Sequence, residues 1–167
     1  MRTLTTDRLI LRPFRPDDEA IHELVFADPD VAREWAGDTR SLPEMRQWLI
    51  HRAWQARHPE DLGLLAVERD GELLGLVGLQ LCVARWLRWR DAPPYNPLEV
   101  EFSHAFGRAH RGRGYEEEAG AAAIAYAFGD LRLARLVSGA DETARRLGFA
   151  PHPDLLEPED GRVLSNR

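Results

Sequence analysis

The stretch 98–128 combines a strand pattern, a glycine-rich turn and a helix pattern with almost nothing between them. From Leu98 to Phe106 the residues alternate between two faces, which is the period of two that a strand requires. The turn His-Arg-Gly-Arg-Gly-Tyr follows at 110–115, and residues 116–128 are rich in alanine and glutamate, which favour a helix. The chain is therefore constrained to an α/β fold in which this turn joins the end of a strand to the start of a helix.

The two faces of this strand differ in character. One face is mostly apolar and carries Leu98, Val100, Phe102, His104 and Phe106. The other face carries Glu99, Glu101, Ser103 and Ala105. Because paired carboxylates on one face repel each other, either Glu99 or Glu101 could have a raised pKa and act as a general base. Two exposed carboxylates on a half-solvated strand are the alternative.

Gly112 and Gly114 lie where backbone N–H groups can approach a ligand, because glycine lacks a Cβ atom. The helix that follows directs the positive end of its dipole at the same point. Cations gather around this turn against a formal net charge of -6, namely Arg108, His110, Arg111 and Arg113. We interpret the turn as a phosphate or pyrophosphate site. A turn without a ligand, with its arginines in solvent, is the alternative.

Two other phosphate motifs are excluded. The chain has no Gly-Lys-Ser/Thr of a nucleoside-triphosphate loop, and the turn lacks the third glycine of a dinucleotide fingerprint.

Composition indicates one ordinary domain over residues 1–167, because 44% hydrophobic residues can fill a single core at this length. The single cysteine, Cys82, excludes an internal disulfide and fits a reducing compartment. No apolar run is long enough to span a membrane, and the N-terminus lacks a charged-then-apolar signal pattern, so we expect a cytoplasmic protein without a membrane partner. The acidic balance also argues against a nucleic-acid partner.

Strands and helices alternate in the N-terminal half. Residues 8–14 read as a strand, and a helix is expected from Asp17 onward with the apolar stripe Ala20, Ile21, Leu24 and Val25. Ser41 and Glu44 form a capping box for a further helix, whose buried face begins with Leu42, Met45 and Trp48.

A hairpin is predicted at Asp70-Gly71, between strands over 62–69 and 72–83. Beyond it, residues 85–90 interleave arginine with tryptophan, and residues 93–97 are rich in proline. Such flat side chains with polar edges could stack bases or cap an acceptor pocket. We favour the other interpretation, an excursion at the end of a hairpin, because a nucleic-acid surface would need cations well beyond this stretch.

Four landmarks appear in one order along the chain. They are Leu4–Pro13 with its Thr-x-Arg-Leu-x-Leu-Arg pattern, Asp28–Val31, Gly112–Tyr115 with Glu118-Ala119, and Leu147–Phe149. This ordered set resembles the GNAT acyltransferases, and within them the Rim-type branch that includes ribosomal-protein N-terminal acetyltransferases. The resemblance implies the GNAT fold, a mixed and mostly antiparallel central sheet with a splayed strand pair, flanked by helices.

The resemblance also implies an activity and a site. The activity is acetyl-CoA-dependent N-acetyl transfer, without a metal. The family places the pyrophosphate on backbone donors of Gly112, Arg113, Gly114 and Tyr115, with Arg111 and Arg113 assisting. It places the thioester carbonyl and the pantetheine amides on the backbone of His104, Ala105 and Phe106. At the position of Glu101 the branch often carries a glutamate, so Glu101 is assigned as the base.

Two departures from the family pattern stand out. Ala109 occupies a position that usually holds Gln or Arg, for which Arg108 or Arg111 could substitute. The connection Leu133–Leu147 has no asparagine and is too short for a strand, a turn and a helix of full length. Either residues are absent from the sequence or the acceptor side is remodelled and more open to water.

That connection normally supplies the group that hydrogen-bonds the CoA sulfur. Ser138, Thr143 and Tyr115 are the candidates, and Ser138 is the first to test. The acceptor is expected to be a primary amine of a protein N-terminus or a small molecule. A non-catalytic acyl-CoA-binding module and a nucleotide-phosphate-binding protein are the alternatives, and a homodimer stays open.

Overall fold

The computed structural model describes residues 1–15, 17–35, 38–55, 62–83, 98–151 and 161–165. Within these residues the strands form one sheet in the order β1 (Leu4–Thr5), β2 (Ile10–Pro13), β3 (Gly63–Arg69), β4 (Glu72–Val83), β5 (Leu98–Phe106), β6 (Arg135–Gly139) and β7 (Gly161–Ser165). The helices are η1 (His22–Phe26), α1 (Pro29–Trp35), α2 (Leu42–Gln55), η2 (Arg108–His110), α3 (Tyr115–Gly129) and α4 (Glu142–Arg146).

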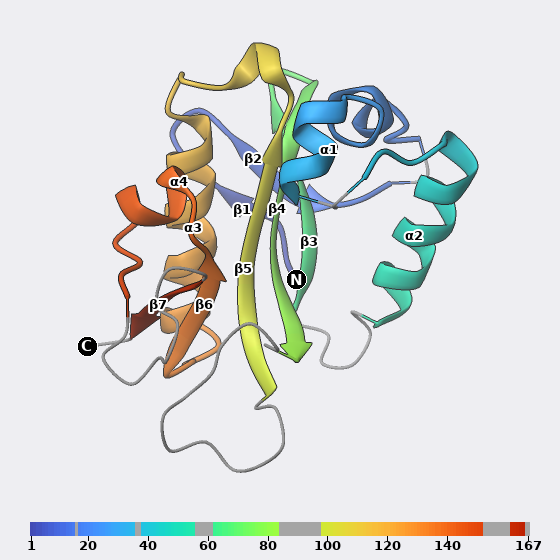
Figure 1. Cartoon of the computed structure of the whole chain (residues 1–167). Coiled ribbons are helices and arrows are strands. Elements are labelled where there is room, and N and C mark those ends of the chain that lie inside the picture. Colours follow the sequence, from blue (N-terminus) through green and yellow to red (C-terminus); the bar gives the residue numbers. More distant parts are fainter. Residues whose placement is uncertain (16, 36–37, 56–61, 84–97, 152–160, 166–167) are drawn as a thin grey trace.

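The sheet is antiparallel except where β5 meets β6. Parallel neighbours need a crossover connection, and α3 provides it. In the register of this pair Glu101 lies opposite Val137. Because β6 ends two residues later at Gly139, β5 runs on to Phe106 with no neighbouring strand on that side among the described residues (Figure 1). The expected mixed, mostly antiparallel sheet with a diverging strand pair is confirmed.

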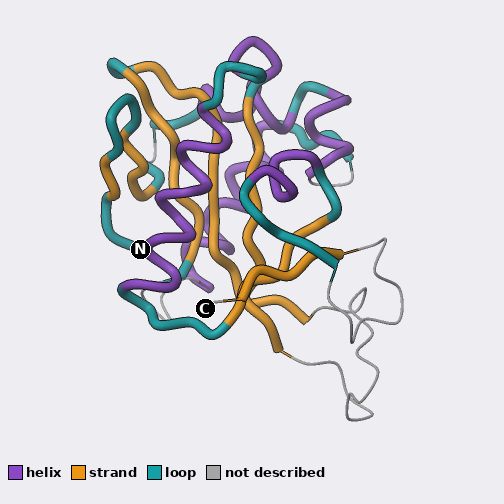
Figure 2. Tube along the Cα trace, turned by 90° about the vertical axis from the view of Figure 1, so that its left-hand side faces the viewer, coloured by secondary structure: helices purple, strands orange, loops and turns teal. Residues whose placement is uncertain are grey.

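Helices cover both faces of the sheet. Figure 2 shows α3 running along one face, and η1, α1 and α2 lie on the other. Alternate residues of β5 enter different cores: Phe102 and Phe106 pack with the buried alanines of α3, whereas Ala105 packs with Phe26 of η1 and Val31 of α1. The alternative interpretation of a half-solvated strand does not hold for this face of β5, because η1 and α1 cover much of it.

The hairpin between β3 and β4 forms at the predicted place. Asp70 and Gly71 both adopt positive φ angles, 50° and 83°. These are the conformations of a tight type I′ turn, which glycine and aspartate tolerate better than most residues. The prediction from the dipeptide is confirmed.

The capping box of α2 is also present. The backbone N–H and the hydroxyl of Ser41 both donate to the Glu44 carboxylate, at 2.8 and 2.6 Å. The helix expected from Asp17 onward is different, because its regular part is a single π-turn, η1, closed by the Ala27 N–H on the His22 carbonyl at 2.8 Å. The Asp18 carboxylate is bound by Arg12 and by the Arg15 N–H, which holds the preceding residues in a turn.

The segment after α3 is as short as the sequence predicts. β6 and α4 have five residues each. Asp141 begins α4 as its N-cap and accepts a hydrogen bond from the Ala144 N–H at 2.7 Å. A strand, a turn and one and a half helical turns thus fit into the abbreviated connection.

Candidate active site

A cavity of about 730 Å³ lies where β5 runs past the end of β6. One wall is β5 and the cross-strand residue Gln80, and the opposite wall is the turn between β6 and α4. Helices α1 and α2 close a third side, and Arg111 and Glu116 mark the end nearest α3. The lining residues are Val31, Glu34, Trp35, Arg40, Trp48, Gln80, Glu101–Phe106, Arg111, Glu116 and Ser138–Thr143.

The N-terminus of α3 opens beside this cavity. Gly114 is the N-cap residue, and both Gly112 and Gly114 have positive φ angles, 71° and 75°. No side chain caps this helix end. Because the first turn of a helix leaves its N–H groups without intrahelical partners, residues 115–117 present backbone donors together with the positive end of the helix dipole. A Cβ added at Gly112 would meet no atom within 4 Å, so the approach to the turn is open.

Two arginines near this turn have different roles. Arg111 lines the cavity, donates from Nε to the Phe106 carbonyl at 3.2 Å and pairs from Nη2 with Glu34 at 2.8 Å. Arg108 is bound by Asp28 and Asp30, and its hydrogen bonds lower the pKa of Asp28 to about 2. Of the two substitutes proposed for Ala109, Arg111 is therefore the one at the cavity.

Tyr115 contributes only its backbone to this end of the site. Its side chain is buried on the other side of α3, where its hydroxyl accepts a hydrogen bond from Arg69 and the Arg8 guanidinium lies 4.7 Å from the ring centre. The Tyr115 hydroxyl is not among the groups lining the cavity, so its candidacy for the CoA sulfur was wrong.

Three carboxylates occupy the first turn of α3, and two of them are paired. Glu118 binds Thr6 and Arg8, each at 2.5 Å, and Glu117 pairs with Arg146 at 2.8 Å. Glu116 instead is half-buried and lines the cavity. Burial raises the pKa of Glu116 above its ordinary value, although the charges of His104 and Arg111 oppose the rise. The sequence pattern identified this glutamate only as a helix former. Its position directly after the phosphate turn is the signal that could have placed it at the cavity.

The two glutamates of β5 have separate surroundings. Glu99 is 5% exposed and binds Arg135 at 2.5 and 3.0 Å. Arg135 balances this charge, so Glu99 is neither an exposed carboxylate nor a candidate base at the cavity. Glu101 is half-buried, lines the cavity and lies directly opposite Gln80 in the β4–β5 register.

Cys82 lies opposite Glu99 in the same register. Burial, with the charges of Glu101 and Glu99, raises the pKa of the Cys82 thiol to about 12. The thiol is protonated at neutral pH and unsuited to carry an acyl group.

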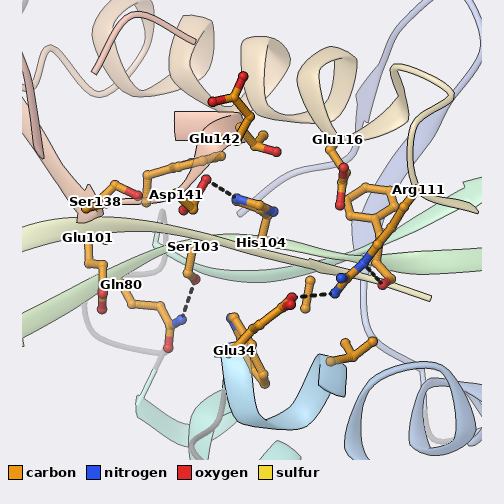
Figure 3. A pocket seen from close by; sticks show the side chains of 18 of the residues that line it. Glu34, Gln80, Glu101, Ser103, His104, Arg111, Glu116, Ser138, Asp141 and Glu142 are labelled. Carbon is orange, nitrogen blue, oxygen red and sulfur yellow. Dashed lines mark hydrogen bonds and ion pairs between the residues drawn. The ribbon is translucent and has the colours of Figure 1, made fainter. Parts of the chain in front are cut away.

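His104 enters the cavity through its side chain as well as its backbone (Figure 3). Its Nε2 lies 3.3 Å from Oδ1 of Asp141, and the ring stands between Asp141 and Glu116. Burial alone would raise the pKa of Asp141, but hydrogen bonds from His104 and from the Ala144 N–H lower it overall. Sequence reasoning used only the backbone of His104 and did not single out Asp141.

Three buried side-chain polar atoms lack a hydrogen-bond partner in the described part of the chain, and all three belong to residues of the cavity wall. They are Arg40 Nε, Gln80 Oε1 and His104 Nδ1. Buried polar groups are nearly always satisfied in folded proteins. Their gathering at one cavity indicates a polar ligand.

Ser138 and Thr143 also reach the cavity wall. Ser138 is 2% exposed at the end of β6, and Thr143 is 9% exposed on α4.

The arginine and tryptophan stretch 85–90 and the proline-rich residues 93–97 lie outside the described residues. Of the residues described, no three His, Cys, Asp or Glu side chains form a group that could hold a metal ion. None of the helices described has the length and apolarity needed to cross a membrane.

Comparison with known proteins gives consistent results. The family model described as "Acetyltransferase (GNAT) domain" matches residues 8–146. The uncharacterized protein YkkB of Bacillus subtilis (strain 168) is 29% identical over 140 residues, which cover 81% of this chain and 73% of YkkB.

Solved structures agree over the whole length. An acetyltransferase from Agrobacterium tumefaciens str. C58 has a TM-score of 0.72 and 26% identity, and the match covers 99% of this chain and 95% of that one. RimL, a ribosomal L7/L12 alpha-N-protein acetyltransferase in complex with coenzyme A, has a TM-score of 0.71 and 13% identity, with 98% of each chain covered. At that identity the likeness to RimL concerns the fold.

Proposed function

The chain belongs to the GNAT acetyltransferase family, and from this premise we propose that it transfers an acetyl group from acetyl-CoA to a primary amine. One observation carries the proposal. A single cavity connects the uncapped N-terminus of α3 with the edge of β5 that has no neighbouring strand. The first feature suits a pyrophosphate, and the second suits an extended chain of amides.

The binding end rests on backbone donors. N–H groups of residues 115–117 would hold the pyrophosphate, and positive φ angles at Gly112 and Gly114 turn the backbone toward it. Arg111 adds a cation at the cavity wall. The ionised Glu116 carboxylate would repel the pyrophosphate. Because the pKa of Glu116 is raised, more of this carboxyl is protonated as the pH falls, and the repulsion becomes weaker. On balance these residues fit coenzyme A.

The reacting end lies along β5. When bound, acetyl-CoA supplies an activated acetyl group. Backbone groups of residues 104–106 would hold its carbonyl and the amides that follow, because β6 no longer occupies this edge. Glu101 would take the proton from the attacking amine, and the unpartnered Gln80 Oε1 would accept another of its hydrogens.

The charge of the cavity favours a cationic acceptor. Glu34, Glu101, Glu116, Asp141 and Glu142 line it, against Arg40 and Arg111. An amine that arrives as an ammonium ion is attracted by such a surface. Both a protein N-terminus, which is the substrate stated in the name of RimL, and a small polyamine have this chemistry.

Calorimetry with CoA, acetyl-CoA, ATP and NAD tests the binding half of the proposal. We expect CoA and acetyl-CoA to bind and the other two to bind at least tenfold more weakly. Gly114→Glu should abolish CoA binding, because it places bulk and negative charge at the helix end. Gly114→Ala is the control for backbone strain without added charge. Gly129→Glu is the control for charge, because it places the same charge at the far end of α3, where an added Cβ meets no atom within 4 Å. Tight ATP binding without CoA binding would overturn the proposal.

Transfer itself is measured by release of the CoA thiol with a panel of amines that includes peptide N-termini, polyamines and amino acids. A second candidate function, a non-catalytic acyl-CoA-binding module, is favoured by the five-residue length of α4, which leaves the thiol end of the cavity thinly covered. CoA binding without transfer to any amine in the panel is the result that would support it.

A further inference from the structure

Thioester aminolysis needs a proton for the departing thiolate, and the cavity holds a group suited to give it. We propose that His104, held by Asp141, is the general acid that protonates the CoA sulfur. This inference rests on the proposed function and adds a residue role to it.

The side of β5 on which His104 lies supports the role. Phe102 and His104 are on the face that packs toward α3, whereas Glu101 shares the other face with Ala105, which packs toward α1. Because the proposed pyrophosphate donors belong to α3, a pantetheine arm extending from them along the cavity would bring its sulfur to the His104 side. The base and the acid thus stand on opposite faces of one strand.

The ring is oriented by its neighbours. Nε2 is 3.3 Å from Asp141 Oδ1, and the same carboxylate oxygen is fixed by the Ala144 N–H as the cap of α4. The Phe102 ring lies beside the imidazole, with centres 5.6 Å apart. Nδ1 is buried and has no partner, so the ring presents one free nitrogen inside the cavity wall.

Charged groups from two helices face His104. Asp141 from the start of α4 and Glu116 from α3 face the ring, and Arg111 is the cation on the same side. A proton donated from the ring is therefore handled among two carboxylates and one guanidinium.

The step balances without a further reactant. The amine nitrogen forms a bond to the thioester carbon, and its extra proton passes to Glu101. The carbon–sulfur bond breaks with its electron pair going to sulfur, and the proton on His104 Nδ1 moves to that sulfur. Glu101 then loses its proton to solvent, and His104 regains one.

Ser138 is the competing candidate, because it is buried at the same cavity. A hydroxyl is a far weaker acid than a thiol, so it can donate a hydrogen bond to the thiolate but not transfer its proton without a partner base. An imidazolium has a pKa near that of the thiol it serves, which is the match that general acid catalysis requires.

The first test measures binding and needs no turnover. Calorimetry compares CoA with desulfo-CoA, which lacks the sulfur. We expect the wild-type protein to prefer CoA by about tenfold, the strength of a hydrogen bond that involves a charged group. His104→Gln should remove that preference, and Ser138→Ala should keep it.

The second test follows kcat against pH. Because the proposed step needs the acid form of His104, kcat should fall on the basic side of the pH profile. His104→Gln should lower kcat about 100-fold and remove this basic limb. Asp141→Asn keeps the helix cap, since asparagine caps as well as aspartate, but it should move the limb to lower pH because the imidazolium loses its anion. Asp130→Asn, which removes an exposed carboxylate bound by Arg2 at the far end of α3, should leave the limb in place.

The outcomes separate the two proposals. If wild-type protein does not bind CoA, the proposed function fails and the role of His104 with it. If CoA binds and His104→Gln, folded by circular dichroism, keeps both the sulfur preference and the basic limb, the role of His104 alone is overturned. Loss of both features in Ser138→Ala would assign the acid to Ser138 instead.

Discussion

Glu99 and Glu101 lie two residues apart on β5 and share one of its faces. Arg135 binds Glu99, which is 5% exposed, so this carboxylate joins β5 to β6 and contributes to the fold. Glu101 lies at the cavity beside Gln80 and Ser103 (Figure 3). The same residue type on the same strand is therefore structural at one position and available for chemistry at the other.

Glu101→Gln should lower kcat about 100-fold and flatten the acidic limb of the pH–rate profile, because an amide cannot take the proton of the amine. CoA affinity should stay within twofold of wild type, since the binding end is at α3. The measurement is the rate of thiol release from pH 5 to 9. The comparison variant, Glu99→Gln, should lower the melting temperature by leaving Arg135 without its anion, while keeping the acidic limb. Identical profiles in the two variants would contradict the assignment.

Glu34→Gln should strengthen CoA binding severalfold. Arg111 pairs with Glu34 at 2.8 Å, and both side chains are partly exposed, 32% and 62%. Such a pair contributes only about 0–1 kcal/mol to stability, so its loss should leave folding intact while releasing the cation for the pyrophosphate. Calorimetry at low and high salt measures the gain, which should shrink as salt screens the charge. Glu23→Gln removes an equal charge from an exposed side chain of η1 and should change nothing.

Local sequence patterns point to the two ends of the candidate site more readily than to its centre. Gly112, Gly114, Arg111 and Glu101 are recognisable from local patterns. The pairing of His104 with Asp141 is not, because it depends on where β6 stops relative to β5, and the strand pattern counts His104 merely as a member of the apolar face.

The first turn of α3 carries opposing demands. Its free N–H groups attract anions, yet Glu116 places a carboxylate of its own at the cavity. The other two carboxylates of this turn, Glu117 and Glu118, stabilise the helix end, so they favour its formation before any ligand arrives. The first turn of α3 is thus formed before phosphate binds, while the Glu116 carboxylate lowers the affinity for phosphate.

Glu116→Gln should raise the melting temperature at pH 7 and leave it unchanged at pH 4. Burial raises the pKa of Glu116 above 4.5, so the folded protein binds this proton more readily than the unfolded chain does. The cost of ionising the buried carboxyl is present above the folded pKa and vanishes below the unfolded value. Thermal melts at both pH values check the sign. Glu117→Gln, which removes one of the two carboxylates bound to Arg146, should give no gain at either pH. An equal gain for Glu116→Gln at both would contradict the explanation.

Elements set by short-range signals agree with the sequence. The β3–β4 hairpin, the start of α2 and the strand–turn–helix from β5 to α3 each depend on residues within one turn of each other. The π-turn η1 was not predictable in this way. Its geometry depends on a side-chain contact between Arg12 and Asp18. This contact joins β2 to the segment before η1.

For the molecule as a whole, the order of landmarks predicted the fold and the family, but not the cavity. The cavity depends on the β5–β6 register and on the length of β6, which no local pattern encodes. Contacts between elements far apart in the chain repeatedly use an arginine and a carboxylate. Arg12 binds Glu68 in addition to the nearby Asp18, and Arg8 binds Glu118.

These ion pairs predict a fold that is sensitive to acid. Burial would raise the pKa of Asp18, but its hydrogen bonds from Arg12 and from the Arg15 N–H lower it below the ordinary 3.8. A group with a lowered folded pKa stabilises the protein above its unfolded pKa, and that contribution is lost as the pH falls through the folded value. The melting temperature should therefore be nearly constant from pH 7 to 5 and fall steeply below pH 4.

Asp18→Asn tests this account directly. Arg12 and Asp18 are only 9% and 8% exposed in their side chains, so removing the anion leaves a buried guanidinium with Glu68 as its remaining charged partner. We expect a loss of about 3 kcal/mol in the free energy of unfolding at pH 7. That deficit should close as the pH falls through the lowered pKa of Asp18, because the wild-type carboxyl then loses its charge as well. Asp17→Asn changes the adjacent, exposed carboxylate and should leave the stability curve as it is. A deficit for Asp18→Asn that is independent of pH would mean that packing, rather than the charge on Asp18, holds β2 to the segment before η1.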